Sequence, residues 1–202
     1  YFAENVDSWL HELGPHIVDL PFWALDLPCP KYVVASGGRY ATNSIADVPD
    51  TMDVIWEWDS MVMTWTLMQS SSFHFGVGQP GTGRKLGIVF HGTEGTLLAN
   101  YGICQVLDKK GNLVEDAEYP AAVPPSPGHE REFLNAIRSR EECSCSFRKH
   151  LSMHTALNLA HIALKTNRKL HWSEEAWQVV GDDEADALCH PTYRAPWKLP
   201  AL

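Results

Sequence analysis

"MDVIWEWDSMVMTWTLMQ", residues 52–69, decides how the middle of this chain folds. Apolar and polar side chains alternate in its first half, and they alternate again after a short break at Asp59 and Ser60. Because successive side chains of a β-strand point to opposite faces, a period of two indicates half-buried strands. A two-residue break joins neighbouring antiparallel strands. The stretch therefore predicts a β-hairpin, with strands at 52–58 and 61–69.

Further strand patterns lie on both sides of this hairpin. "KYVVASGGRYAT" at 31–42 has β-branched and aromatic residues around two glycines, which predicts a strand, a bend and a second strand. Residues 86–102 predict two strands around a Gly-containing turn, and residues 104–116 predict another hairpin. A Gly- and Ser-rich connection at 70–85 and a Pro-rich linker at 120–129 separate these segments.

Helical patterns stand at the two ends of the chain. Apolar residues recur at helical spacing in 10–25, 128–140 and 148–169. A helix, then six or more strands, then helices, predicts an α+β fold with a large, mostly antiparallel open sheet and helices packed on one face. The length of 202 residues favours a single domain over 1–202.

The second face of such a sheet needs an explanation of its own. We expect Met and Trp side chains of residues 52–68 to line it. An apolar face of more than a few hundred Å² is typical of a contact between subunits or domains.

Composition excludes several classes of protein. The net charge of −9 and the lack of a basic cluster argue against a nucleic-acid partner. The chain contains no run of 18 apolar residues, so we expect no membrane span. The five cysteines are odd in number and scattered, which favours reduced thiols. His150, His154 and His161 lie near one helix face but lack a further ligand, so we expect no metal site.

The first predicted helix carries a candidate catalytic pair. Glu12 and His16 are one turn apart and therefore share a helix face, with Asp19 three residues further on. Glu12 can accept a hydrogen bond from one imidazole nitrogen of His16 and leave the other nitrogen for a substrate proton, as suits a general acid/base. The other interpretation is a partly buried histidine whose hydrogen bonding is satisfied by a neighbouring carboxylate in an ordinary core helix.

Six segments, taken in order, resemble the C-terminal domain of the Gfo/Idh/MocA oxidoreductases. The opening "LHELGPHIVDLPFW" resembles the family's "D-x-G-x-H-x-x-D" pattern. The other five are "PKYVVASGGRY", "VFHGTEGTLLANYG", "GHEREFLNAIRSRE", "SMHTALNLAHIALKTNRKLHW" and "YRAPWKL". Together they cover nearly the whole chain.

The resemblance implies a function for the helix at 10–25. His16 would be the acid/base at a substrate hydroxyl or carbonyl, and Glu12, where the family usually has Asp, would orient its ring. Asp19, His154 and Tyr193 are available to bind a sugar, polyol or cyclitol. The resemblance also implies hydride transfer with NAD or NADP, and a homodimer or homotetramer formed through the sheet face.

The family's cofactor motifs are missing from these 202 residues. Neither a Gly-rich phosphate loop followed by a helix nor "EKP" occurs, and the chain begins at Tyr1. We therefore expect the substrate and oligomerisation domain of a longer enzyme, with no cofactor bound by this chain alone. A natural standalone protein is the other possibility. The cytoplasm is favoured, although an export signal would lie in the missing N-terminal part.

Two other functions stay open at this point. One is the family's glycosidase branch, in which bound NAD permits elimination and addition at a sugar. The other is a non-catalytic module for dimerisation through the sheet, or for ligand binding, that lacks the cofactor domain.

Overall fold

The structure is a computed structural model that describes residues 8–70, 86–119, 123–190 and 192–198. The chain divides into two compact units, which are described separately below. The first unit comprises Tyr1–Ser70 and Leu151–Leu202, and the second comprises Ser71–His150. The assignment of 1–202 to one domain stays a prediction.

The first unit contains a five-stranded antiparallel sheet with the strand order β3-β2-β1-β7-β8. Its strands are β1 (Tyr32–Gly38), β2 (Thr51–Glu57), β3 (Val62–Met68), β7 (Leu170–Ser173) and β8 (Gln178–Val179). In the β2–β3 hairpin Val54 stands opposite Trp65. The N–H of Trp58 donates to the carbonyl of Met61 at 2.9 Å and closes the turn. The hairpin predicted from residues 52–69 is therefore confirmed.

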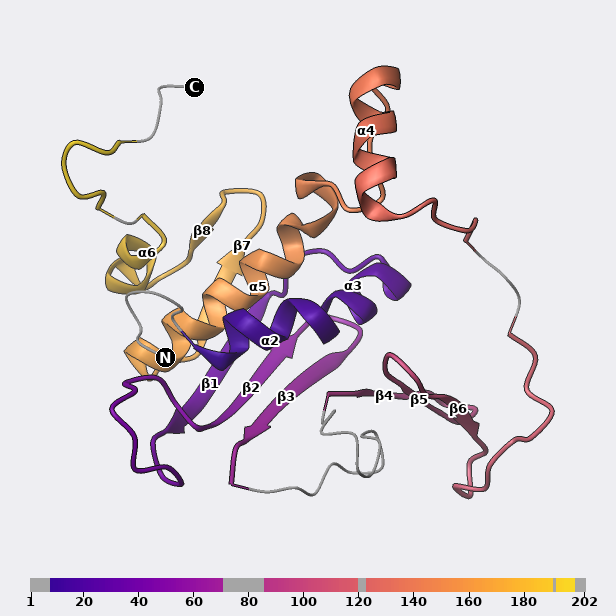
Figure 1. The fold of residues 1–202 in the computed structure, drawn as a ribbon. Coiled ribbons are helices and arrows are strands. Elements are labelled where there is room, and N and C mark those ends of the chain that lie inside the picture. The colour runs from indigo at the N-terminus through magenta and orange to yellow at the C-terminus, as the bar shows by residue number, and fades with distance from the viewer. Residues whose placement is uncertain (1–7, 71–85, 120–122, 191, 199–202) are drawn as a thin grey trace. The chain divides into compact units, whose positions relative to one another are not determined.

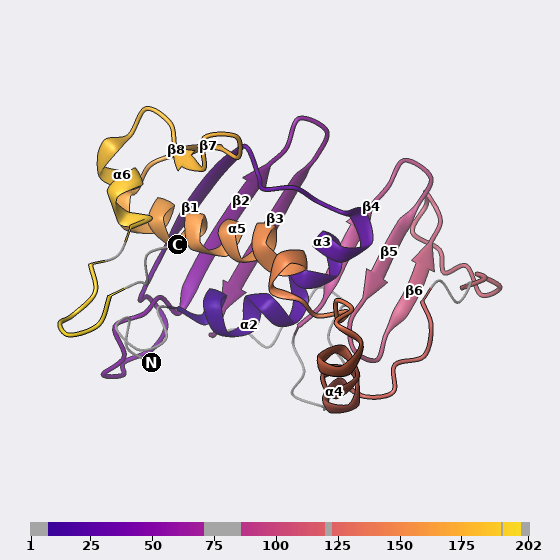
Figure 2. The same cartoon turned by 90° about the horizontal axis from the view of Figure 1, so that it is seen from above.

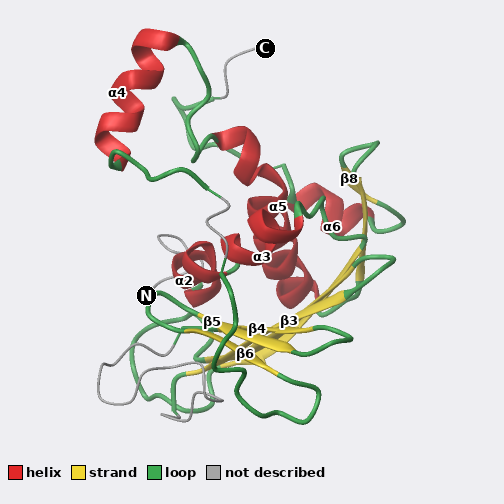
Figure 3. Cartoon of the chain, turned by 90° about the vertical axis from the view of Figure 1, so that its right-hand side faces the viewer, coloured by secondary structure: helices red, strands yellow, loops and turns green. Residues whose placement is uncertain are grey.

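Helices cover one face of this sheet, as Figures 1 and 3 show for α2, α3 and α5. The helices of the first unit are α2 (Trp9–Ile17), α3 (Asp19–Leu25), α5 (Phe147–Thr166) and α6 (Asp183–Leu188). The indole N–H of Trp56 on β2 donates to the carbonyl of Ala156 on α5 at 2.9 Å. The predicted α+β class, with helices on one face of an antiparallel sheet, is confirmed.

The assignment of the Met and Trp side chains to the open face is wrong for Met52, Trp56, Met63 and Trp65, which are all buried, whereas Met68 is exposed on that face. The hydrogen bond from Trp56 to α5 puts this residue on the face that the helices cover, and the strand register and alternation put Met52, Met63 and Trp65 on the same face. Figure 2 shows the helices over that face from above. Large apolar side chains are stabilised most by removal from water. The alternate positions of β2 and β3 form the other face, and they are Asp53, Ile55, Glu57, Val62, Thr64, Thr66 and Met68.

The second unit holds a separate three-stranded antiparallel sheet and one helix. Its elements are β4 (Ile88–His91), β5 (Thr96–Ala99), β6 (Cys104–Leu107) and α4 (His129–Ser139). The predicted hairpin at 104–116 forms with short pairing beyond β6. An isolated bridge joins Leu107 to Leu113, and the N–H groups of Asp108 and Val114 donate to the carbonyls of Asn112 and Val106, both at 2.9 Å. Within the turn, the carboxylate of Asp108 accepts the backbone N–H groups of Lys110 and Asn112, both at 2.8 Å. The predicted strands thus divide between two sheets.

Two further boundaries differ from the prediction. The helix expected over 10–25 is interrupted at Val18, since Pro21 has no N–H to donate to the carbonyl of Ile17. The pattern at 31–42 forms the single strand β1, and the chain then turns around Asp50. Most of the connection at 70–85 and part of the linker at 120–129 lie outside the described residues.

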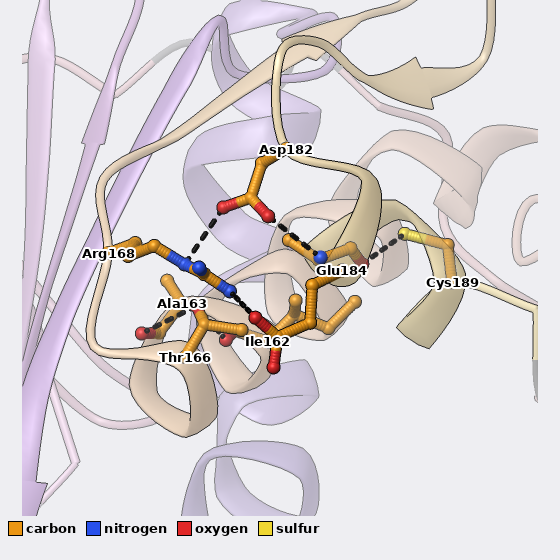
Figure 4. Close-up of polar contacts among 8 residues, drawn as sticks. Ile162, Ala163, Thr166, Arg168, Asp182, Glu184 and Cys189 are labelled. Atoms are coloured by element: carbon orange, nitrogen blue, oxygen red, sulfur yellow. Dashed lines mark hydrogen bonds and ion pairs between the residues drawn. The ribbon is translucent and has the colours of Figure 1, made fainter.

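Ion pairs hold α6 to the end of α5 (Figure 4). The Nε of Arg168 donates to Asp182 at 2.9 Å, and its Nη2 donates to Glu184 at 2.7 Å. Asp182 also caps α6, because its other carboxylate oxygen accepts the N–H of Ala185 at 3.0 Å. Among the described helices, none has both the length and the apolar character that a membrane crossing requires.

Candidate functional site

Helix α2 carries both Glu12, which is partly buried, and His16. Leu10, Gly14 and Ile17 form its buried side, whereas His16 is exposed. The helix and the one-turn spacing are therefore as predicted. The Oε2 atom of Glu12 is buried and makes no hydrogen bond, so this oxygen does not form the expected orienting contact. The roles of Glu12 and His16 stay predictions.

The flank of α2 that faces α5 carries a polar cluster that the sequence analysis missed. The Nε2 of His11 lies 3.0 Å from the Oδ1 of Asn158, and its Nδ1 lies 3.2 Å from the Oγ of Ser8. The rings of His11 and His161 meet edge to face, with centroids 5.7 Å apart. Asn158 is exposed on α5, next to the buried Leu157 and Leu159, and no local sequence pattern marks it as a partner of His11.

Asp19 and His154 are on two different helices of the first unit. Asp19 is the first residue of α3, and His154 is exposed on α5, one turn before Asn158. Their roles in substrate binding stay predictions.

Tyr193 is in the tail that follows α6, and its side chain is 47% exposed. In residues 8–70, 86–119, 123–190 and 192–198, no hydrogen bond or ion pair joins Tyr193 to α2 or α5. The role of Tyr193 in substrate binding stays a prediction.

Asp50 is a second polar centre that the sequence analysis did not single out. It is 2% exposed, yet its carboxylate accepts the backbone N–H groups of Tyr40, Ala41 and Thr42 and the hydroxyls of Thr42 and Thr51. These donors, that of Tyr40 above all, hold the pKa of Asp50 well below its ordinary value despite burial. Asp50 thus fixes the loop that follows β1.

The described residues offer neither an activated thiol nor a metal cluster near α2. Burial raises the pKa of the Cys29 thiol to about 11, with a further contribution from the charge of Glu174, so this thiol is protonated and unreactive. Within the described ranges no three His, Cys, Asp or Glu side chains gather closely enough to hold a metal ion.

Comparison with known proteins identifies the family. The Gfo/Idh/MocA sequence model described as "Oxidoreductase family, C-terminal alpha/beta domain" matches residues 90–199. The chain therefore belongs to the Gfo/Idh/MocA oxidoreductases and corresponds to their C-terminal domain. A search of curated protein sequences found no match.

Solved structures share this fold at low sequence identity. An oxidoreductase from Agrobacterium radiobacter, in complex with NAD+, L-tartaric acid and magnesium, superposes with a TM-score of 0.55 at 16% identity over 80% of this chain and 48% of that one. An NAD-binding protein from Listeria innocua superposes with a TM-score of 0.57 at 17% identity, over 81% of this chain and 47% of that one. The WlbA dehydrogenase from Bordetella pertussis, in complex with NADH and UDP-GlcNAcA, superposes with a TM-score of 0.53 at 16% identity. The match covers 82% of this chain and 46% of that one. The chain spans about half the length of these structures.

Proposed function

We propose that this chain is the substrate-binding and oligomerisation half of an NAD(P)-dependent oxidoreductase that acts on a hydroxyl or carbonyl group of a sugar, polyol or cyclitol. The observation that carries the proposal is the exposure of His16 on α2, in the segment whose sequence resembles the family's acid/base motif. L-tartaric acid and UDP-GlcNAcA, found in two of the similar structures, also carry hydroxyl groups.

His16 would move one proton in this reaction. In the oxidative direction its imidazole takes the proton of the substrate hydroxyl, and in the reductive direction it returns the proton to the carbonyl oxygen. The nicotinamide, when bound, supplies the hydride exchange at the carbinol carbon. Glu12 would orient the imidazole of His16, and Asp19, His154 and Tyr193 would bind other hydroxyl groups of the substrate.

The cofactor fits poorly onto the described part of this chain. Every strand pairing in its two sheets is antiparallel. The dinucleotide-binding fold instead uses parallel strands and a Gly-rich turn that leads into a helix. We therefore infer that another part of the enzyme holds NAD(P), and that the chain described here contributes the proton-transfer and substrate-binding groups.

The test is the reduction of NAD+ or NADP+ by the full-length enzyme, followed at 340 nm, with myo-inositol, D-glucitol and D-glucose as probes. His16→Gln is expected to lower kcat about 10²–10⁴-fold, because general acid/base catalysis contributes that much. The matched control is His129→Gln, since His129 is an exposed histidine on α4, in the other unit. Turnover by His16→Gln at the rate of the unaltered enzyme would remove His16 from the mechanism.

We further propose that copies of the chain associate through the open face of the five-stranded sheet. Three apolar side chains of that face are exposed in the first unit: Ile55 at 38%, Val62 at 58% and Met68 at 41%. Neighbouring threonines and Asp53 leave the face mixed rather than charged, as suits a contact between subunits.

A further inference from the structure

Helix α2 approaches α5 closely at Gly14. A Cβ on Gly14 would lie 3.0 Å from the Cδ2 of Leu157 and 3.4 Å from the Cδ1 of Leu10, both of which are fully buried. A larger residue at this position would therefore force Leu157 and Leu10 to shift by a few tenths of an ångström. This apolar contact sets the distance between α2 and α5, but it does not by itself fix the rotation of α2 about its axis.

His11 supplies a directional contact next to Gly14. Because a carboxamide oxygen only accepts, the Nε2 of His11 donates to Asn158, and the Nδ1 accepts the hydroxyl proton of Ser8. Ser8 is itself buried and caps α2 by accepting the N–H of His11 at 3.3 Å. Both ring nitrogens of His11 thus have partners in the protein, which suits a fixed group better than one that exchanges protons with a substrate.

The helix geometry connects this contact to the proposed catalytic pair. At about 100° per residue, His11 and Gly14 are roughly 60° apart on the flank that faces α5. His16 lies about 140° from His11 around the helix, and Glu12 lies about 160° from Gly14, so both are on the other flank. Any rotation of α2 that broke the contact between His11 and Asn158 would also turn Glu12 and His16.

We propose that His11 and Asn158 form a positioning pair that fixes the rotation of α2 on α5 and thereby the direction of the His16 imidazole. The catalytic consequence rests on the function proposed above, whereas the structural consequence for His16 does not. His11 and Asn158 themselves contact neither substrate nor cofactor in this proposal, and they act only through α2.

The test compares three substitutions on α5 in the full-length enzyme. Asn158→Leu removes the acceptor at similar size, Asn158→Asp keeps an acceptor, and Lys165→Leu is the control, because Lys165 is exposed on the same helix. The first readout is NMR of the labelled histidine rings. Asn158→Leu is expected to remove the single-tautomer signature of His11 and to shift the ring signals of His16. Asn158→Asp and Lys165→Leu should leave the signals of His16 in place.

The second readout is catalysis with the three probes named above. Asn158→Leu should lower kcat about 10–100-fold, as a small misplacement of a catalytic group does, and leave the KM for NAD+ unchanged. Asn158→Asp should restore most of the rate. Unchanged signals of His16 together with an unchanged kcat in a folded Asn158→Leu enzyme would overturn the positioning pair. If the unaltered enzyme turns over none of the probes and the signals of His16 still shift, the proposed function fails while the positioning pair stands.

Discussion

At the scale of single residues, Asp50 shows how one carboxylate organises a loop. Its acceptor atoms satisfy three consecutive N–H groups at Tyr40, Ala41 and Thr42, which no strand partner reaches. The exposed side chain of Tyr40 is therefore presented by a loop of fixed shape, because a buried charge of this kind is stable only while its hydrogen bonds are complete.

Asp50 also predicts a pH dependence of stability. Its folded pKa lies below the ordinary aspartate value of about 4, so protons bind more readily to the unfolded chain as the pH falls. The stability that Asp50 contributes is therefore fully present at neutral pH and is lost progressively below about pH 4. Urea unfolding at several pH values should show a weaker acid destabilisation in Asp50→Asn than in the unaltered chain. The control is Asp53→Asn, because Asp53 is exposed on β2, and this variant should keep the full acid destabilisation.

Sequence reasoning succeeded at this scale only where the helix period alone determines the result. It placed Glu12 and His16 on one helix face because that relation depends on nothing else. It missed His11, Asn158 and Asp50, since each depends on a partner distant in the chain or on a loop conformation that no local pattern encodes.

At the scale of elements, the contact between β2 and α5 depends on Trp56. Replacing Trp56 by Phe keeps an aromatic ring but removes the donor to the carbonyl of Ala156, so we expect a loss of about 1–3 kcal/mol in the free energy of unfolding. Chemical denaturation measures this difference. Trp58→Phe is the matched control, because its indole N–H donates to Pro28 at 3.0 Å from a more exposed position. An equal loss in the two variants would show that burial does not set the strength of the Trp56 contact.

Helix α6 depends more on its N-cap than on its ion pairs. Asp182→Ala removes both the cap on Ala185 and the partner of Arg168, and we expect it to cost about 0.5–2 kcal/mol of unfolding free energy. Glu184→Ala removes only an exposed ion pair and should cost less, since solvent screens such pairs. Thermal unfolding with and without added salt distinguishes the two variants. The effect of Asp182→Ala should persist at high salt, and its disappearance there would assign the effect to charge alone.

The elements themselves were largely predictable, with boundary errors that have local causes. Alternation located β2 and β3, and helical spacing located α4 and α5. The break at Val18 was missed because the apolar residues around Pro21 continue the helical spacing, and this spacing alone predicted one unbroken helix. The choice of sheet face was wrong because period two separates two faces without saying which one the helices cover.

At the scale of the whole molecule, association through the open sheet face can be tested with one substitution. Val62→Glu places a charge at the most exposed apolar position of the face, and we expect it to shift the sedimenting species toward the monomer, because an unpaired charge in an interface is costly. Leu151→Glu, at an apolar residue that is 49% exposed on α5 rather than on the sheet, should leave the assembly unchanged. A monomeric unaltered chain would exclude the proposed contact.

The division into two units was not evident from the sequence, because both sheets are antiparallel and their strands share the same alternation. Hydrophobic pattern reports burial, and it does not report which sheet a strand joins. The family resemblance, by contrast, depended on the order of motifs along the whole chain, which is why it survived errors in single elements.

The first unit is assembled from two stretches that the ribosome delivers at different times. β1 can pair with β2 once both strands have been made, but its other edge pairs with β7, which is translated only after the entire second unit. An open strand edge recruits foreign strands. The nascent chain is therefore most exposed to misassembly while residues between Gly38 and Leu170 are being made, and slow translation through that interval lengthens the exposure.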